Sequence, residues 1–154
     1  MQTTVTVEPF LVMGISVRTT NRDGKAMTDI GSLWQRFYSE YIEAKILGRV
    51  GNEVYGIYTN YKSDHTDEYT AIIGYKVSSI ENVPPGFSAV KIPGGKYAKF
   101  VAKGKMPDAV VNEWTAIWKM GEQLQRSYTS DFEVYDTRSH DPNNAEVDIF
   151  VAIR

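Results

Sequence analysis

The chain has 154 residues, of which 42% are hydrophobic and 23% charged, and its formal net charge is −2. This composition is typical of a globular protein with a buried core, and it lacks the strongly basic balance of chains that bind nucleic acid. The absence of cysteine excludes disulfides and thiolate chemistry and fits a cytoplasmic location. We find no signal peptide and no run of 18 apolar residues, so we expect no contact with a membrane.

The first half of the chain predicts one strand, one helix and two further strands. The helix is indicated by apolar residues that recur every three or four positions, and Thr28 or Asp29 would serve as its N-cap. The strands are indicated by β-branched and aromatic runs that end at polar connections. We expect these four elements, in chain order, at residues 10–19, 28–46, 52–61 and 69–77.

The second half predicts the same order of elements. Residues 78–86 contain two prolines and a glycine, which exclude regular structure and mark a linker. The next strand is interrupted or turned at Pro93, and Pro107 stands where the first turn of a helix tolerates proline. We expect the elements of this half at residues 87–104, 106–124, 131–137 and 145–154.

A repeated tripeptide supports an internal duplication. Glu-Val-Tyr begins at Glu53 and again at Glu133, and the same number of residues separates Trp34 from Trp114. The repeat therefore predicts an α+β fold of two duplicated β-α-β-β halves related by a pseudo-twofold axis. In this fold antiparallel sheets carry helices packed on them, and a ligand cleft lies between the halves. Residues 1–154 would form a single domain, with halves at about 1–80 and 86–154.

The sequence allows two interpretations of Glu133. Side chains alternate along a strand, so Glu133 shares a face with Tyr135, while Phe132 and Val134 point the other way. A glutamate flanked in this way can point inward, where it needs a partner such as a cationic ligand. The alternative is a glutamate on the solvent face or paired with a nearby lysine or arginine, which is the more common situation.

Trp114 and Trp118 are four residues apart on the predicted second helix and therefore share one of its faces. They could form an aromatic wall over a cleft, but aromatic residues at helical spacing are more often ordinary core.

No pattern for metal, cofactor or nucleophilic chemistry stands out. His65 and His140 lie in polar connections, and the acidic residues around His65 match no known ligand spacing. There is no G-x-S-x-G motif, and no histidine lies outside the loops to act as a base. We therefore expect no metal, no cofactor and no assigned catalytic residue, although a glutamate assisted by a tyrosine remains possible in an apolar pocket.

Several segments together resemble the GyrI-like small-molecule-binding domain. They include "VEPFLVMGISVRTT", "LWQRFYSEY", "PPGFSAVKIPGGKYAKFVAKG", "VVNEWTAIWKMGEQL" and "SDFEVYD". GyrI-like domains are effector-binding modules of AraC- and MerR-type bacterial regulators and also occur as stand-alone proteins. The resemblance covers nearly the whole chain, which has no helix-turn-helix of its own.

The resemblance implies an aromatic pocket between the halves in which a glutamate, Glu133 by motif, receives cationic lipophilic compounds. Glu53 would then be only a structural counterpart. The expected ligand-binding residues are Glu133, Trp114, Trp118, Tyr135, Tyr55, Tyr58, Tyr75 and Phe10. We expect a small-molecule ligand, no direct nucleic acid binding, and an unidentified protein partner such as a regulator or gyrase. Relatives also suggest two alternatives, a hydrolase of cyclopropane-bearing electrophiles and an interaction protein of the gyrase-inhibitor kind.

Overall fold

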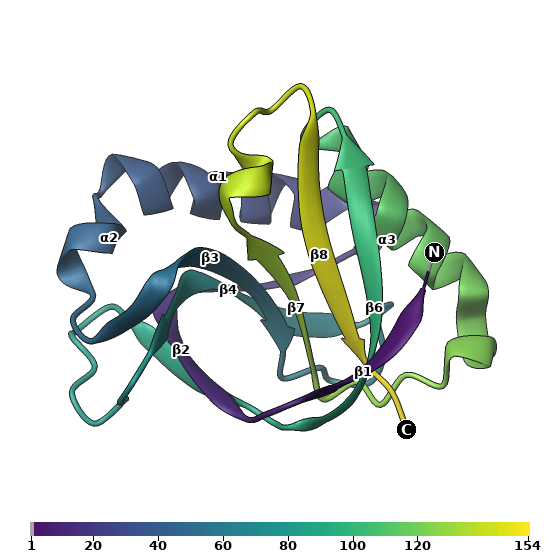
Figure 1. Cartoon of the computed structure of the whole chain (residues 1–154), viewed down its shortest axis with the longest axis horizontal. Coiled ribbons are helices and arrows are strands. Elements are labelled where there is room, and N and C mark those ends of the chain that lie inside the picture. Colours follow the sequence, from purple (N-terminus) through teal and green to yellow (C-terminus); the bar gives the residue numbers. More distant parts are fainter. Residues whose placement is uncertain (1) are drawn as a thin grey trace.

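The computed structural model describes residues 2–154, which contain the predicted β-α-β-β series twice (Figure 1). A strand at Thr3–Val7 and a short separate helix at Ile42–Lys45 are additional to the prediction. The strands are β1 (Thr3–Val7), β2 (Phe10–Thr20), β3 (Arg49–Thr59), β4 (Glu68–Val77), β5 (Ser88–Ile92), β6 (Gly95–Gly104), β7 (Ser130–Tyr135) and β8 (Ala145–Ala152). The α-helices are α1 (Lys25–Ser39), α2 (Ile42–Lys45) and α3 (Asp108–Met120). Short 3-10 turns lie at Arg22–Gly24, Gly121–Leu124 and Thr137–Ser139.

All eight strands of residues 2–154 belong to one antiparallel sheet in the order β1-β6-β8-β7-β3-β4-β2-β5. The duplicated β-α-β-β fold is confirmed, but its two halves share one continuous sheet because β3 pairs with β7. The outermost strands are exchanged: β1 pairs with β6 of the second half, and β5 pairs with β2 of the first. The exchange ties the two halves together at both edges of the sheet.

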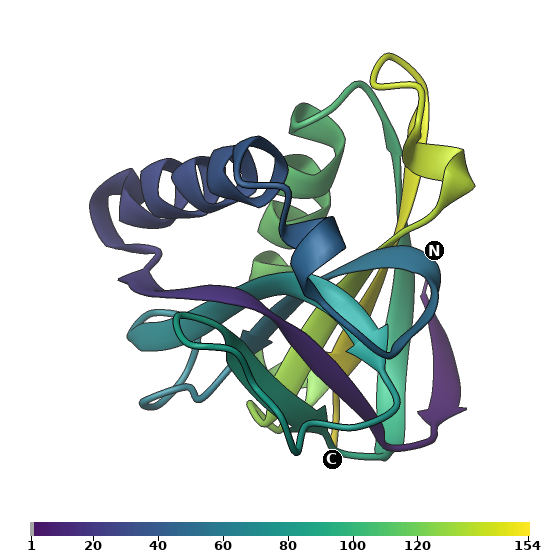
Figure 2. The ribbon, with the colours of Figure 1, turned by 90° about the vertical axis from the view of Figure 1, so that its left-hand side faces the viewer.

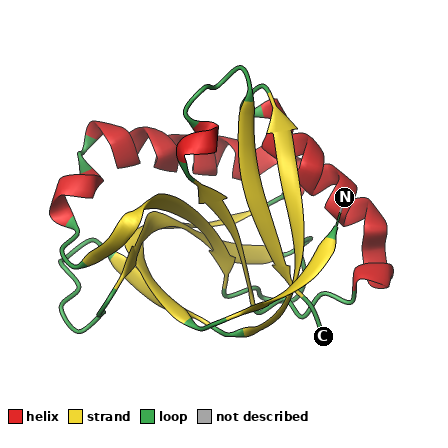
Figure 3. Cartoon of the chain, viewed as in Figure 1, coloured by secondary structure: helices red, strands yellow, loops and turns green. Residues whose placement is uncertain are grey.

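Helices α1 and α3 lie on the same side of the sheet, as the views in Figures 2 and 3 show. Each helix packs apolar residues at the spacing that the sequence predicts, although Tyr41, which was expected to continue the first helix, is 75% exposed. Leu33 and Phe37 of α1 join a core with strands β2 and β4, and Trp114 and Ile117 of α3 join a core with strands β6 and β8. The opposite face of the sheet curls around a third core that includes Val12, Ile57, Ile92, Tyr97 and Phe132. The molecule is therefore a half-barrel with helices on its outer side.

The first helix differs from the prediction at both ends. It begins at Lys25, after Gly24 in a left-handed conformation, so neither Thr28 nor Asp29 is its N-cap. Asp29 instead accepts hydrogen bonds from Thr19 Oγ1 and Lys25 Nζ. The helix stops at Ser39, because Tyr41 adopts φ 53° and separates α1 from α2.

Two glycines occupy facing positions on strands β2 and β4. Gly14 and Gly74 are paired across the ladder. A Cβ atom on Gly14 would overlap the Ile73 carbonyl, and one on Gly74 would overlap the Met13 carbonyl. Both glycines lie on the inner side of the curl, so their lack of a side chain lets the two strands bend there.

We therefore expect Gly74→Ala to lower the free energy of unfolding by about 1–3 kcal/mol, because neighbouring backbone must shift. Gly31→Ala is the matched control, since Gly31 is exposed in α1 and an added Cβ meets no atom within 4 Å. It should raise stability by up to about 1 kcal/mol. Urea denaturation of the three proteins measures both effects, and equal behaviour of the two variants would contradict this account of the curl.

Candidate functional site

Glu133 lies at the centre of the sheet, on the face that carries the helices. Its side chain is 1% exposed. Three donors meet its carboxylate: Tyr58 Oη at 2.9 Å and Trp114 Nε1 at 2.6 Å from Oε2, and Tyr135 Oη at 2.6 Å from Oε1. A carboxylate has about four acceptor positions. The chain therefore fills most of them and leaves one free, at Oε1.

The residue directly opposite Glu133 on β3 is Gly56. A Cβ atom at this position would lie 2.9 Å from Glu133 Oε1. Any other residue at position 56 would push against the carboxylate, so the glycine makes room for it. Gly56 therefore contributes to the site by leaving space for the Glu133 carboxylate.

Aromatic side chains surround Glu133 symmetrically. Tyr58 lies two residues after Gly56 and Tyr135 two residues after Glu133, so the β3·β7 pairing places them on the same face, on either side of the carboxylate. Trp34 of α1 meets the ring of Tyr135 edge-on at 5.0 Å, and Trp114 of α3 meets the ring of Tyr58 edge-on at 5.5 Å. We call these four residues around Glu133 the aromatic box.

Burial dominates the electrostatics of the aromatic box. The pKa of Glu133 is raised by desolvation, although the hydrogen bonds from Tyr135, Trp114 and Tyr58 act in the opposite direction. The pKa values of the Tyr58 and Tyr135 hydroxyls are raised well above their ordinary value by desolvation and by the nearby carboxylate. Both tyrosines are therefore neutral donors at physiological pH. A positive charge placed beside Glu133 would relieve the penalty of its burial.

The predicted ligand-binding residues divide into separate groups. The structure brings Glu133, Tyr58, Trp114 and Tyr135 together. Trp118 lies elsewhere, stacked on His65 with their ring centres 5.7 Å apart. His65 belongs to a polar connection, as the sequence indicates, but this contact leaves it only partly exposed.

Three further predicted residues face other spaces. Tyr75 lines a cavity beside α2. Phe10 and Tyr55 line a smaller cavity of about 240 Å³ on the opposite face of the sheet. Tyr55 points away from Glu133 because it precedes Gly56, the residue that faces Glu133, and successive residues of a strand lie on opposite faces.

The repeated tripeptide does not mark equivalent positions. Glu53 shares a face with Tyr55, whereas Glu133 pairs with Gly56 and lies on the other face. The residue that pairs with Glu133 is Gly56 and not its sequence counterpart Glu53. Sequence reasoning had one usable signal for Gly56, because a glycine inside a strand often marks the close approach of another group. Trp34 had the same helical spacing as Trp114 but was not among the expected ligand-binding residues.

One known protein family matches nearly the whole chain. Residues 3–153 match the family model described as "Integron-associated effector binding protein". The chain belongs to this family of effector-binding proteins. The resemblance seen in the sequence is thereby confirmed, and with it the fold of the effector-binding domain.

Solved structures and relatives agree with this family. The integron cassette protein from the mobile metagenome of Vibrio cholerae shares 33% identity and a TM-score of 0.78, over 99% of this chain and 95% of that one. The protein SAV2435, solved bound to tetraphenylphosphonium, has a TM-score of 0.81 at 17% identity, over 100% of this chain and 94% of its own, which shows the shared fold.

Two relatives bear the names of transcriptional regulators. YobU of Bacillus subtilis (strain 168) is 28% identical over 146 residues, which are 92% of this effector-binding protein and 90% of YobU. The transcriptional regulator BrlR of Pseudomonas aeruginosa is 33% identical over 130 residues, which are 80% of this chain. The chain spans only about half of BrlR, since the match covers 46% of that protein.

No helix in residues 2–154 is long and apolar enough to cross a membrane. Within the same residues, no group of three or more histidine, aspartate or glutamate side chains is arranged to hold a metal ion.

Proposed function

We propose that this effector-binding protein binds amphipathic, cationic small molecules at Glu133, inside the aromatic box. The observation that carries the proposal is a carboxylate that is 1% exposed and has no basic residue among its hydrogen-bond partners. Such a charge is costly to bury, and a cationic ligand would neutralise it. The aromatic rings would add cation–π attraction and apolar contact without demanding one ligand shape. Broad specificity for lipophilic cations is the expected consequence.

Binding requires that some of the surrounding rings move. Glu133 is inaccessible, and the hydroxyl groups of Tyr58 and Tyr135 occupy positions that a ligand would approach. Trp34 is only half-buried, and it holds Tyr135 by an edge-on contact. We therefore place the ligand between the two helices, in space vacated by Trp34 and Tyr135, with the free acceptor position of Glu133 Oε1 beside it.

The structure of SAV2435 with tetraphenylphosphonium supplies the first ligand to test. We also propose that ligand binding serves regulation or sequestration in the cytoplasm, through a protein partner and without direct nucleic acid contact. The regulator names of YobU and BrlR support this role.

The test is a titration of tryptophan fluorescence with tetraphenylphosphonium, with neutral triphenylphosphine oxide as the comparison ligand. Glu133→Gln should weaken binding of the cation by about 10–100-fold, because the buried carboxylate that neutralises the positive charge is lost. It should change binding of the neutral compound by less than about threefold. A glutamine is the appropriate replacement, since its oxygen can accept from Trp114 and Tyr58 while its amide donates to Tyr135.

Trp118→Phe is the matched control, because Trp118 lies against His65 and outside the aromatic box. This variant should keep the quenching response of the wild type, which then comes from Trp34 and Trp114. Equal loss of cationic and neutral ligand in Glu133→Gln would refute the role of Glu133 as counter-charge.

A hydrolase is the second candidate, favoured by one observation. The pKa of Glu133 is raised by burial, and its carboxyl lies 2.6 Å from the Tyr135 hydroxyl, a combination that suits activation of water. Incubation with a cyclopropane-bearing electrophile, followed by chromatography, separates the two candidates. Binding alone predicts recovery of the intact compound. A ring-opened product formed by the wild type but not by Glu133→Gln or Tyr135→Phe would establish hydrolysis instead.

A further inference from the structure

A second cavity, of about 390 Å³, lies between the C-terminal end of α1, helix α2 and strands β3 and β4. It is lined by Phe37, Tyr38, Tyr41, Glu43, Ala44, Arg49 and Tyr75. Its volume falls in the range of small-molecule sites, and four of its seven lining residues are aromatic. Two of these, Tyr38 and Tyr41, are 63% and 75% exposed and form the mouth. Exposed aromatic side chains around a hollow are typical of a binding surface.

Arg49 is the charged centre of this cavity. Its guanidinium lies 4.8 Å from the centre of the Tyr75 ring, and its Nη1 lies 3.2 Å from Glu43 Oε1. The two partners differ in how firmly they are held: the side chain of Arg49 is 28% exposed, whereas that of Glu43 is 65% exposed. Arg49 is thus fixed against an aromatic face, while Glu43 reaches it from the solvent.

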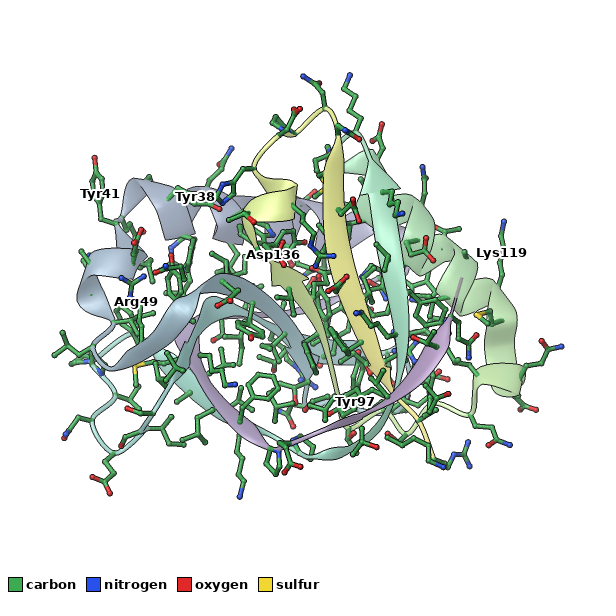
Figure 4. All side chains as sticks on the ribbon, viewed as in Figure 1. Tyr38, Tyr41, Arg49, Tyr97, Lys119 and Asp136 are labelled. Carbon is green, nitrogen blue, oxygen red and sulfur yellow. The ribbon has the colours of Figure 1, made fainter. Side chains whose placement is uncertain are left out.

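This cavity is separate from the Glu133 site. Tyr38 stacks on Trp34 with ring centres 6.0 Å apart, and Trp34 in turn meets Tyr135. None of the residues that line the cavity touches the carboxylate of Glu133, and the contacts from Tyr38 to Glu133 run through Trp34 and Tyr135. Figure 4 shows Tyr38, Tyr41 and Arg49 at one end of the molecule, whereas Lys119 lies at the other.

The difference in exposure decides which charge the cavity accepts. A cationic ligand would have to displace Arg49 from Tyr75 and bury its own charge in the same place. An anionic ligand needs only to displace Glu43, whose exposed ion pair contributes little to stability. The planar guanidinium then offers two parallel donors that match a carboxylate, and the surrounding rings offer apolar faces.

We propose that the cavity formed by Phe37, Tyr38, Tyr41, Tyr75 and Arg49 is a second ligand site, specific for aromatic carboxylates. The carboxylate pairs with Arg49 in place of Glu43, and the aromatic ring lies between the side chains at the mouth. This site goes beyond the proposed function, because it is a different cavity and selects the opposite charge.

The test uses isothermal titration calorimetry with 2-naphthoate and with 2-naphthylmethylammonium, which carry the same rings and opposite charges. Arg49→Gln should weaken 2-naphthoate binding at least about tenfold, because a charge-assisted pair is lost. Glu43→Gln should strengthen it several-fold, because the competing carboxylate is gone. Lys119→Gln and Glu122→Gln change the net charge equally at exposed residues elsewhere and should leave the affinity unchanged.

Three outcomes would overturn the proposal. The first is tighter binding of 2-naphthylmethylammonium that is lost in Glu43→Gln, which would make the cavity a cation site. The second is 2-naphthoate binding that is lost in Glu133→Gln but kept in Arg49→Gln, which would move the anion to the aromatic box. The third is no measurable binding of either compound to the wild type. None of them depends on whether tetraphenylphosphonium binds at Glu133, so failure here and failure of the proposed function remain distinguishable.

Discussion

Replacement of Asp131 by asparagine should lower the free energy of unfolding by about 3–5 kcal/mol, because it leaves a buried arginine without its counter-charge. Asp131 is 0% exposed and Arg126 6% exposed, and their side chains meet at 2.7 Å. Asp131 also accepts hydrogen bonds from Tyr61 Oη at 2.6 Å and from the Ala152 amide at 2.8 Å. One carboxylate thus joins the loop before β7 to the end of β8.

The loss should extend to the aromatic box. Asp131 lies two residues before Glu133 on the same face of β7, and the guanidinium of Arg126 lies 5.8 Å from the ring centre of Trp114. An unpaired Arg126 would leave this position and release Trp114, which donates to Glu133. The near-ultraviolet circular dichroism of Asp131→Asn should therefore change even at temperatures where the variant is folded.

Two controls isolate the buried pair in a thermal or urea unfolding experiment. Glu40→Gln breaks an ion pair with Arg36 whose side chains are both about half exposed, and it should cost less than about 1 kcal/mol. The double variant Arg126→Met/Asp131→Asn removes both charges and should recover much of the lost stability. A loss in Asp131→Asn no larger than in Glu40→Gln would show that the pair is not a stabilising contact.

Alternation along β7 was enough to predict that Glu133 shares a face with Tyr135, but it left open whether that face is buried. The flanking residues Phe132 and Val134 are apolar, and a period of two places them together on one face and Glu133 with Tyr135 on the other. The helices followed equally from their apolar spacing. These properties depend on neighbouring residues only, so the sequence carries them directly.

Pairing between distant segments was beyond the sequence. Strand β1 was not predicted, because its exposed threonines make a short edge strand that is completed only by pairing with β6. The pairing of Gly56 with Glu133 depends on the register of β3 against β7, and a shift of one residue would have brought Tyr55 to the carboxylate instead. For the same reason the sequence grouped Phe10, Tyr55 and Tyr75 in one pocket, whereas Tyr75 lines a different cavity from Phe10 and Tyr55.

The site contains a single glutamate, because the position that faces Glu133 in the other half has no room for a second one. The two halves contribute equivalent aromatic pairs, Tyr58 with Trp114 and Tyr135 with Trp34, but the residues between them are Gly56 and Glu133. A second carboxylate at position 56 would meet Glu133 Oε1 and add like charge to a buried place. The aromatic box therefore surrounds a single carboxylate, and under the proposed function it would take a ligand with one positive charge.

The pH dependence of Glu133 should act on stability and on ligand binding in opposite directions. Because the folded pKa of Glu133 lies above its unfolded value, the folded protein holds this proton more tightly than the unfolded chain. The resulting contribution to stability is fully present below the unfolded value, about 4.3, and is lost as pH rises through the folded pKa. The stability of the wild type relative to Glu133→Gln should fall over this window.

Affinity for tetraphenylphosphonium should rise over the same window, because the cation requires the ionised carboxylate. The increase should approach tenfold per pH unit below the folded pKa and level off above it. Measurement at each pH against Glu133→Gln cancels other titrating groups, such as Asp136, whose pKa is lowered by hydrogen bonds from Arg138. The variant and the neutral triphenylphosphine oxide should both give flat profiles. Parallel profiles for the cation in wild type and Glu133→Gln would mean that the cation does not sense this carboxylate, whatever its affinity.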